Sequence, residues 1–251
     1  MSPDHSAAAR LQHLSAESAS SSIGASSTPV VLPVTAAQSE VWVGQQLNPG
    51  SPVYNLSLVV EVAGPIDLDR TVAAIRKTVA RADALHVRFE RGEGNELLQV
   101  PTAPGEWTLS VVDLRREEDP EASARAWMDR DMETVVDIEG DEPLFRHALL
   151  RTGDESVIWY QRYHHSLIDG YGITLLVADV VHRYDHPELE TSTAPWPLDS
   201  LVASDRDYRA SERFESDRDF WIRQVVDAAG TAPPAPARSS TTPGRRSPPS
   251  S

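Results

Sequence analysis

The chain has 251 residues, of which 38 are acidic and 23 are lysine or arginine, giving a net charge of −15. A nucleic acid or an anionic membrane needs a cationic face on its partner, so this balance argues against both. With no cysteine there is no disulfide framework and no thiolate zinc site, which favours a reducing, cytoplasmic compartment. No apolar run is long enough to span a bilayer, and the first thirty residues lack the pattern of a secretory signal.

The two ends of the chain differ in composition from its middle. Residues 1–32 are dense in serine and alanine and poor in large apolar side chains, which predicts a disordered leader. Residues 230–251 contain proline, serine, threonine and arginine but no acidic residue, which predicts a disordered tail. This tail is either a native linker or the product of truncated or frameshifted coding. The folded body is therefore expected to span residues 33–229.

The first half of the body predicts a helix, a strand and a second helix. The first helix is expected from Thr35, its N-cap, to about Leu47. Alternating apolar and polar residues over 54–62 predict a strand, which Gly64-Pro65 ends. Asp67 is expected to cap the second helix, whose apolar residues fall on one face: Leu68, Val72, Ile75, Val79 and Ala82.

The remaining elements alternate irregularly between strands and helices. Short strands are expected at 86–90, 96–100 and 108–113, a helix at 120–134, and a hairpin of strands 144–151 and 156–164 turning at Gly153-Asp154. Another helix opens near Gly170, and helices at 199–210 and 212–228 complete the body. This order predicts an α/β fold in which helices cover a mixed sheet.

The junction between strand 156–164 and the next helix reads His164-His165-Ser166-Leu167-Ile168-Asp169-Gly170. Successive strand residues point to opposite faces, so one imidazole can be reactive while the other is structural. Unpaired backbone N–H groups near Gly170, where the helix begins, can stabilise developing negative charge. A neutral imidazole beside such donors can accept a proton from an attacking amine or hydroxyl. The junction is therefore a candidate acyl-transfer site, in which Asp169 pairs with an arginine.

Less specific interpretations of this junction remain open. Two adjacent histidines and an Asp-Gly turn also occur in solvated loops. A metal site formed by His164, His165 and Asp169 is disfavoured, because neighbouring strand residues diverge and no second ligand cluster is present. A nucleophilic Ser166 is disfavoured further, because the glycine pattern of a nucleophile elbow is missing.

Residues Tyr160 to Gly170 resemble the core motif of condensation domains in nonribosomal peptide synthetases, which belong to the chloramphenicol-acetyltransferase-like superfamily. Three further segments resemble family motifs in the same order. They are 34–42, similar to the opening S-x-A-Q-x-x-x-W helix; 82–89, similar to R-H-E-x-L-R-T-x-F; and 141–145, which leads to the active-site hairpin. The pattern is similar to siderophore-type modules such as enterobactin synthetase. The resemblance covers 33–229 and implies the amino-terminal lobe of a two-lobed fold.

The resemblance also implies roles for residues and partners. His165 would be catalytic, as general base or by positioning the acceptor amine that attacks the donor thioester. His164 would be mainly structural, Asp169 would orient the loop through an ion pair, and Gly170 would let substrates approach the backbone. Tyr163 could line the tunnel or pack in the core. Donor and acceptor would arrive on the 4′-phosphopantetheine arms of carrier proteins, with no metal and no directly bound cofactor.

The chain departs from the family pattern in two places. His86 stands where the family has the arginine that often pairs with the motif aspartate, and Arg88, two residues on, is a possible substitute. Nothing after Trp221 resembles the family's carboxy-terminal lobe, which supplies the floor and latch of the tunnel. This absence favours truncation or frameshift, and makes that lobe and the downstream synthetase domains expected partners. The chain alone is then expected to form little amide.

Other functions remain possible for such a chain. A stand-alone acyltransferase of the same superfamily needs only the His-x-x-x-Asp-Gly core, although Gln38 and Trp42 favour condensation. An epimerisation domain also has the double histidine, whereas the heterocyclisation branch has aspartate where His164 stands. A different class is a non-catalytic remnant that only docks carrier proteins. The residues do not identify the donor acid or the acceptor amino acid.

Overall fold

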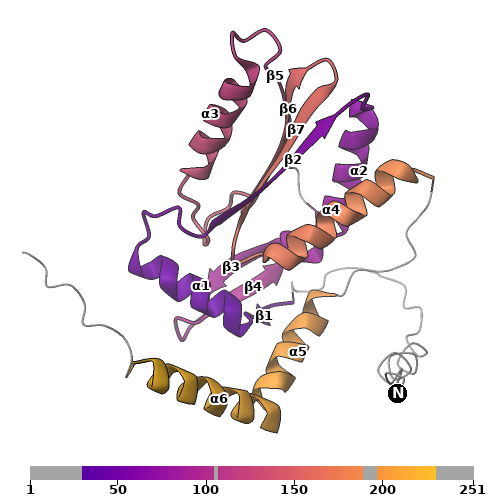
Figure 1. Cartoon of the computed structure of the whole chain (residues 1–251). Coiled ribbons are helices and arrows are strands. Elements are labelled where there is room, and N and C mark those ends of the chain that lie inside the picture. The colour runs from indigo at the N-terminus through magenta and orange to yellow at the C-terminus, as the bar shows by residue number, and fades with distance from the viewer. Residues whose placement is uncertain (1–29, 105–106, 189–196, 230–251) are drawn as a thin grey trace, which may run out of the picture.

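We describe the protein from a computed structural model, which covers residues 30–104, 107–188 and 197–229 (Figure 1). The predicted leader and tail fall almost entirely outside these ranges. Leu32, predicted to end the leader, instead begins strand β1 (Leu32–Pro33), where it pairs with Gln99. A neighbouring strand supplies backbone partners that the composition of the leader did not indicate.

A four-stranded sheet forms the centre of the molecule. Its order is β2 (Asn55–Ala63), β7 (Ser156–His164), β6 (Phe145–Gly153) and β5 (Leu109–Asp113). Strand β7 is antiparallel to both of its neighbours, whereas β5 is parallel to β6, so the sheet is mixed as predicted. This topology places β7, which ends in the histidine pair, at an interior position of the sheet.

Helices cover both faces of this sheet (Figure 1). Helix α3 (Pro120–Met132) lies against one face, and helices α2 (Leu68–Arg81) and α4 (Gly170–Asp185) lie against the other. On β7, Trp159 and Tyr163 pack in the core on the α2/α4 side, while Ile158 and Tyr160 pack on the α3 side. Because β7 is buried on both faces, its apolar residues form a nearly continuous run rather than an alternating one.

A smaller sheet and the remaining helices lie beside this core. Strand β4 (Leu97–Pro101) pairs with β1 on one side and β3 (Val87–Arg91) on the other, and the short 3-10 helix η1 (Asp83–Leu85) precedes β3. Helix α1 (Ala36–Leu47) lies close to this sheet, and α5 (Leu198–Arg209) leads into α6 (Glu212–Ala229), which extends away from both sheets (Figure 1).

The predicted helix starts are confirmed by their caps. The Thr35 hydroxyl accepts the N–H of Gln38, and the Gln38 side chain accepts the Thr35 N–H at 2.9 Å, forming a capping box. Asp67 caps α2 by accepting the N–H of Arg70 at 3.0 Å. Among the helices that the structure describes, none is long and apolar enough to cross a membrane.

Candidate active site

The histidine pair lies where β7 ends and α4 begins. The His164 N–H donates to the Leu144 carbonyl and the His165 N–H donates to the Tyr54 carbonyl, each at 2.8 Å. These acceptors come just before β6 and β2, which flank β7 on opposite sides. The two successive N–H groups thus bond to the segments on opposite sides of β7, and these bonds fix the start of the loop.

His165 is half-buried and has one committed ring nitrogen. Its Nδ1 lies 3.2 Å from the carbonyl oxygen of Ile168. A carbonyl only accepts hydrogen bonds, so Nδ1 carries the proton and Nε2 of the neutral ring keeps its lone pair. His165 also lines a pocket of about 180 Å³ with six other residues: Leu56, Ser57, Leu58, Gly170, Ile173 and Thr174. The ring can therefore act as a base beside a small cavity.

His164 is placed very differently, with only 2 % of its surface exposed. Its Nδ1 lies 2.8 Å from the Ser166 hydroxyl and accepts the Ser166 N–H at 3.3 Å. Burial, with smaller contributions from the charges of His165 and Arg162, lowers the pKa of His164 to about 4. His164 is thus neutral at pH 7 and holds the turn of the loop together.

Asp169 is the N-cap of α4 rather than the partner of an arginine. Its carboxylate accepts the N–H of Gly172 at 2.8 Å, and the side chain is exposed. None of the ion pairs between described residues includes Asp169, so the predicted ion pair is not found there. The physical reason is local: the carboxylate satisfies a first-turn N–H three residues ahead.

Gly170 opens α4 beside the pocket. A Cβ built at this position would meet no atom within 4 Å, so the backbone here borders open space. The first N–H groups of a helix lack intrahelical partners, and those of Gly170 and Tyr171 belong to this first turn. Gly170, at the start of the helix, and His165 therefore line the same small cavity.

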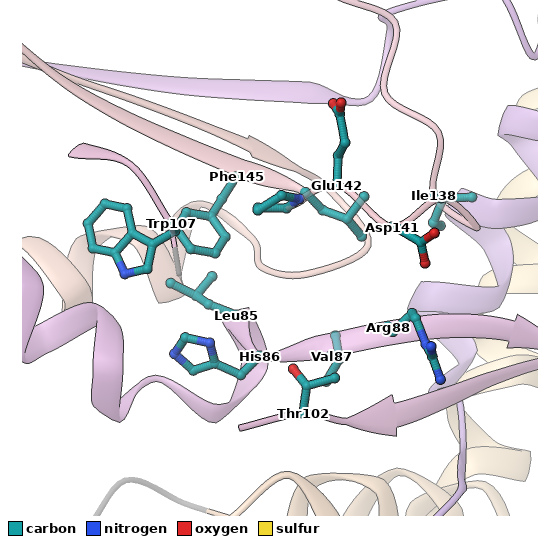
Figure 2. Close-up of a pocket in the computed structure, with 13 residues that line it drawn as sticks. Leu85, His86, Val87, Arg88, Thr102, Trp107, Ile138, Asp141, Glu142 and Phe145 are labelled. Atoms are coloured by element: carbon teal, nitrogen blue, oxygen red, sulfur yellow. The ribbon is translucent and has the colours of Figure 1, made fainter. Parts of the chain in front are cut away.

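His86 and Arg88, considered in place of the family arginine, lie away from the histidine loop. His86 is buried, with its Nε2 2.8 Å from the Val79 carbonyl at the end of α2. Arg88 is exposed on β3 and pairs with Glu90. Both line a separate pocket of about 230 Å³ beside Trp107 and Phe145 (Figure 2). Neither residue contacts the histidine loop through a described hydrogen bond or ion pair.

Tyr163 does not line a tunnel, because its side chain is completely buried. Its hydroxyl donates to Gln161 Oε1 at 2.9 Å and lies 3.1 Å from Nε2 of His147. Trp159 donates in turn to His147 Nδ1 at 3.3 Å. Burial raises the pKa of Tyr163 and lowers that of His147 to about 3, so both groups are neutral. This network belongs to the core beneath the site.

Gln38 connects the opening motif to the histidine loop, and the sequence did not predict this contact. Gln38, at the start of α1, donates from Nε2 to the Ser166 carbonyl at 3.1 Å and to Gln99 Oε1 at 3.2 Å. Its place in the capping box could have been predicted from Thr35-x-x-Gln38, but its contact with a loop 128 residues later could not. Within the described residues, no group of three histidine, aspartate or glutamate side chains could hold a metal.

The fold and the site together define an acyltransferase-like lobe, with a histidine at a strand-helix junction beside an open cavity. Comparison with known proteins identifies the family: the condensation domain model matches residues 30–247. The chain therefore belongs to the condensation domain family of nonribosomal peptide synthetases.

Several relatives support this assignment. The chain is 40% identical over 206 residues to an isonitrile lipopeptide synthase from Streptomyces coeruleorubidus, covering 81% of this chain and 14% of the relative. It is 30% identical over 217 residues to enterobactin synthase component F from Escherichia coli K12, covering 84% of this chain and 17% of the relative. These relatives are therefore much longer proteins.

Solved structures give the same result. The starter condensation domain of rhizomide synthetase is 34% identical with a TM-score of 0.70, covering 77% of this chain and 45% of that one. The first condensation domain of the calcium-dependent antibiotic synthetase is 32% identical with a TM-score of 0.71, covering 79% and 48%. The fold is thus the chloramphenicol-acetyltransferase-like fold of these domains, and the chain spans slightly less than half of each solved domain.

Proposed function

We propose that this chain supplies the histidine-bearing lobe for amide formation between an acyl thioester donor and an amine acceptor. The observation that carries the proposal is the His165 ring, which lines a cavity at the start of α4; its Nδ1 is bonded to the Ile168 carbonyl, and its Nε2 has no hydrogen-bond partner among the described residues. The donor and acceptor classes are taken from the family, with both substrates carried on the phosphopantetheine arms of carrier proteins.

In the proposed reaction, the acceptor nitrogen attacks the thioester carbonyl carbon. A C–N bond forms, the carbonyl oxygen becomes an oxyanion, and first-turn N–H groups of α4 stabilise its charge. Nε2 of His165 takes the proton released by the attacking nitrogen and returns it to the departing thiolate as the C–S bond breaks. The products are the amide and a free thiol, so no external oxidant or reductant is required.

We infer that the catalytic unit needs a second lobe. The support is the coverage of 45% and 48% of the solved relatives, together with the exposure of the α4 surface beside the cavity, where Tyr171 is 74% exposed. A cavity open on one side admits water and does not hold two substrates in line. The chain alone is therefore expected to form little or no amide.

For the acyl donor, only the chemical class can be proposed. A solved structure of the rhizomide relative contains C8-CoA and Leu-SNAC, which supports an acyl thioester as donor and an aminoacyl thioester as acceptor. A siderophore product has support from enterobactin synthase component F, while the more similar isonitrile lipopeptide synthase points to a lipopeptide. We therefore propose only the reaction class for this chain.

The test compares the chain alone with the chain joined to the carboxy-terminal half of a related condensation domain. Each is incubated with C8-CoA and Leu-SNAC, and the amide is quantified by mass spectrometry. We expect product only from the joined protein, with loss of at least about 100-fold in His165→Ala, as for removal of a general base. His186→Ala, an exposed histidine just after α4, is the matched control and should retain activity.

Two results would contradict separate parts of the proposal. Strong amide formation by the chain alone, abolished in His165→Ala, would show that no second lobe is needed. Product from the joined protein that is unaffected by His165→Ala would remove the catalytic role of this residue. If a hydroxyl acceptor is added to the same assay, transfer to the hydroxyl and not to the amine of Leu-SNAC would favour the stand-alone acyltransferase alternative.

A further inference from the structure

Three buried polar atoms without a hydrogen-bond partner lie close behind the histidine loop. They are Asn55 Oδ1, Arg162 Nη1 and His164 Nε2, which are three of the five such side-chain atoms among the described residues. The exposed fractions of the three residues are 8%, 5% and 2%. An unpaired buried donor or acceptor destabilises a fold, so this concentration of unpaired atoms requires an explanation.

The sheet register places the three side chains on one face. Asn55 on β2 lies directly opposite His164 on β7, and Arg162 lies two residues before His164 on the same strand. Directly opposed residues in antiparallel strands share a face, and so do residues two apart on one strand. This face is the one covered by α3, because Tyr160, two residues before Arg162 on β7, packs in the core on the α3 side.

Two of the side chains also converge on the end of α3. Asn55 Nδ2 donates to the carbonyls of Met132 at 2.9 Å and Thr134 at 2.8 Å. Arg162 Nε donates to Asp131 Oδ2 at 2.7 Å. Both side chains are therefore held at the last turn of α3, with His164 facing Asn55 across the strand pair.

The polarity of each unpaired atom is determined by the partners of its own residue. Because Nδ2 of Asn55 donates to two carbonyls, its amide orientation is set and Oδ1 is an acceptor. Nη1 of Arg162 can only donate. Nδ1 of His164 accepts the Ser166 N–H, so Nε2 carries the ring proton and is a second donor. The group thus presents two donors and one acceptor.

One water molecule matches this set. Water accepts two hydrogen bonds and donates two, and buried waters usually make about three bonds to otherwise unpaired groups. A simple cation would be repelled by the Arg162 guanidinium. An anion without a proton could not donate to Asn55 Oδ1. The set is therefore specific for a small neutral molecule that both donates and accepts.

We propose that Asn55, Arg162 and His164 bind one ordered water behind the histidine loop. This water joins β2, β7 and the end of α3, and it holds His164 in the tautomer that leaves Nδ1 free to accept from Ser166. His164 is thereby a positioning residue for the turn that carries His165. Water binding by these three residues does not depend on whether the chain forms amides.

The experiment is solution NMR on the full chain with ¹⁵N-labelled histidine. A long-range ¹H–¹⁵N spectrum gives the tautomer of His164, and a ROESY experiment shows whether its Nε2 proton lies beside water. We expect the Nε2–H tautomer, with a water cross-peak of the sign that marks a bound water rather than proton exchange. The Nδ1–H tautomer, or a protected Nε2 proton with no water cross-peak, would overturn the proposal.

A variant at Asn55 provides the second measurement. Asn55→Leu removes the acceptor at similar volume and should abolish the water cross-peak. Glu61→Gln, an exposed change on the same face of β2, is the control and should leave the cross-peak unchanged. A full-strength cross-peak in Asn55→Leu would overturn the role of Asn55, and if that variant does not fold, the tautomer and the water cross-peak of the unsubstituted chain still decide the proposal.

Discussion

At the scale of single residues, the two neighbouring histidines differ because a strand directs their side chains apart. His164 enters the face packed by α3 and becomes neutral by burial, while His165 reaches a cavity and keeps a lone pair on Nε2. The same short segment therefore provides one group for structure and one for chemistry. Burial and hydrogen bonding, more than residue type, decide which is which.

The buried histidines should make stability depend on pH. The folded pKa is about 4 for His164 and about 3 for His147, both below the ordinary value of 6.5. Below pH 6.5 the unfolded chain binds protons that the folded chain does not, so the free energy of unfolding decreases as the pH falls. The expected slope is about 1.4 kcal/mol per pH unit for each histidine.

Urea unfolding between pH 7 and pH 4.5 measures this slope. His147→Gln should reduce the slope by ~1.4 kcal/mol per pH unit, because the unfolded chain then has one fewer histidine to protonate. His186→Gln, at an exposed site, should leave it unchanged. Equal slopes in wild type and His147→Gln would show that His147 is not held neutral by burial.

Two variants distinguish whether the Asp169 carboxylate acts as a helix cap or as a member of an ion pair. Asp169→Ala removes the hydrogen bond to the Gly172 N–H and should lower the free energy of unfolding by about 1 kcal/mol. Asp169→Asn keeps the cap without the charge, so its loss should stay below about 0.5 kcal/mol. Chemical denaturation of both variants checks this, and an equal loss in the two would indicate that the charge itself has a partner.

At the scale of elements, the loop is held by helix α1 as well as by its own strand. Gln38 connects the start of α1 to the Ser166 carbonyl and to Gln99, whose side chain is fully buried. An amide can do this because it donates with Nε2 while its oxygen accepts the Thr35 N–H. The opening motif and the histidine motif thus form one structural unit.

Removing the Gln38 amide should loosen the loop. Gln38→Ala leaves Gln99 Oε1 and the Ser166 carbonyl without this donor, so we expect a loss of about 1–3 kcal/mol in stability. Amide hydrogen exchange should accelerate at Leu167, whose N–H donates to the His164 carbonyl within the loop. Glu40→Ala, an exposed change on the same helix, is the control, and unchanged loop exchange in Gln38→Ala would refute the link.

At the scale of the whole molecule, helices pack on both faces of the central four-stranded sheet, and helix α6 extends beyond this core (Figure 1). Helix α6 leads away from both sheets (Figure 1). Several of its large apolar side chains are exposed. The exposed residues include Phe220, Trp221, Ile222, Val225 and Val226. Trp221 is 64% exposed, whereas Trp42 is buried.

The two tryptophans should therefore respond differently to truncation. Trp42 donates to Glu139 at 3.0 Å and lies under the Arg91 guanidinium, so Trp42→Ala should lower the free energy of unfolding by about 3–5 kcal/mol. Trp221→Ala should change it by less than about 0.5 kcal/mol. Urea denaturation gives both values, and a large loss in Trp221→Ala would show that α6 packs against the core in solution.

Local sequence patterns determined the elements of this protein and the position of its histidine junction. Thr35, Asp67 and Gly170 mark helix starts because capping and turn chemistry depend on a few neighbouring residues, and period-two patterning located β2 for the same reason. The motif order along the chain also indicated the family, which the comparisons confirmed.

Contacts between distant residues were decided only by tertiary structure. Asn55 donates to the carbonyls of Met132 and Thr134, Tyr163 is buried in the core, and Gln38 donates to the Ser166 carbonyl. Each of these outcomes depends on which strands become neighbours and which face a helix covers. Hydrogen-bond partners depend on distances of a few ångströms between segments far apart in the chain, and composition and spacing do not contain that information.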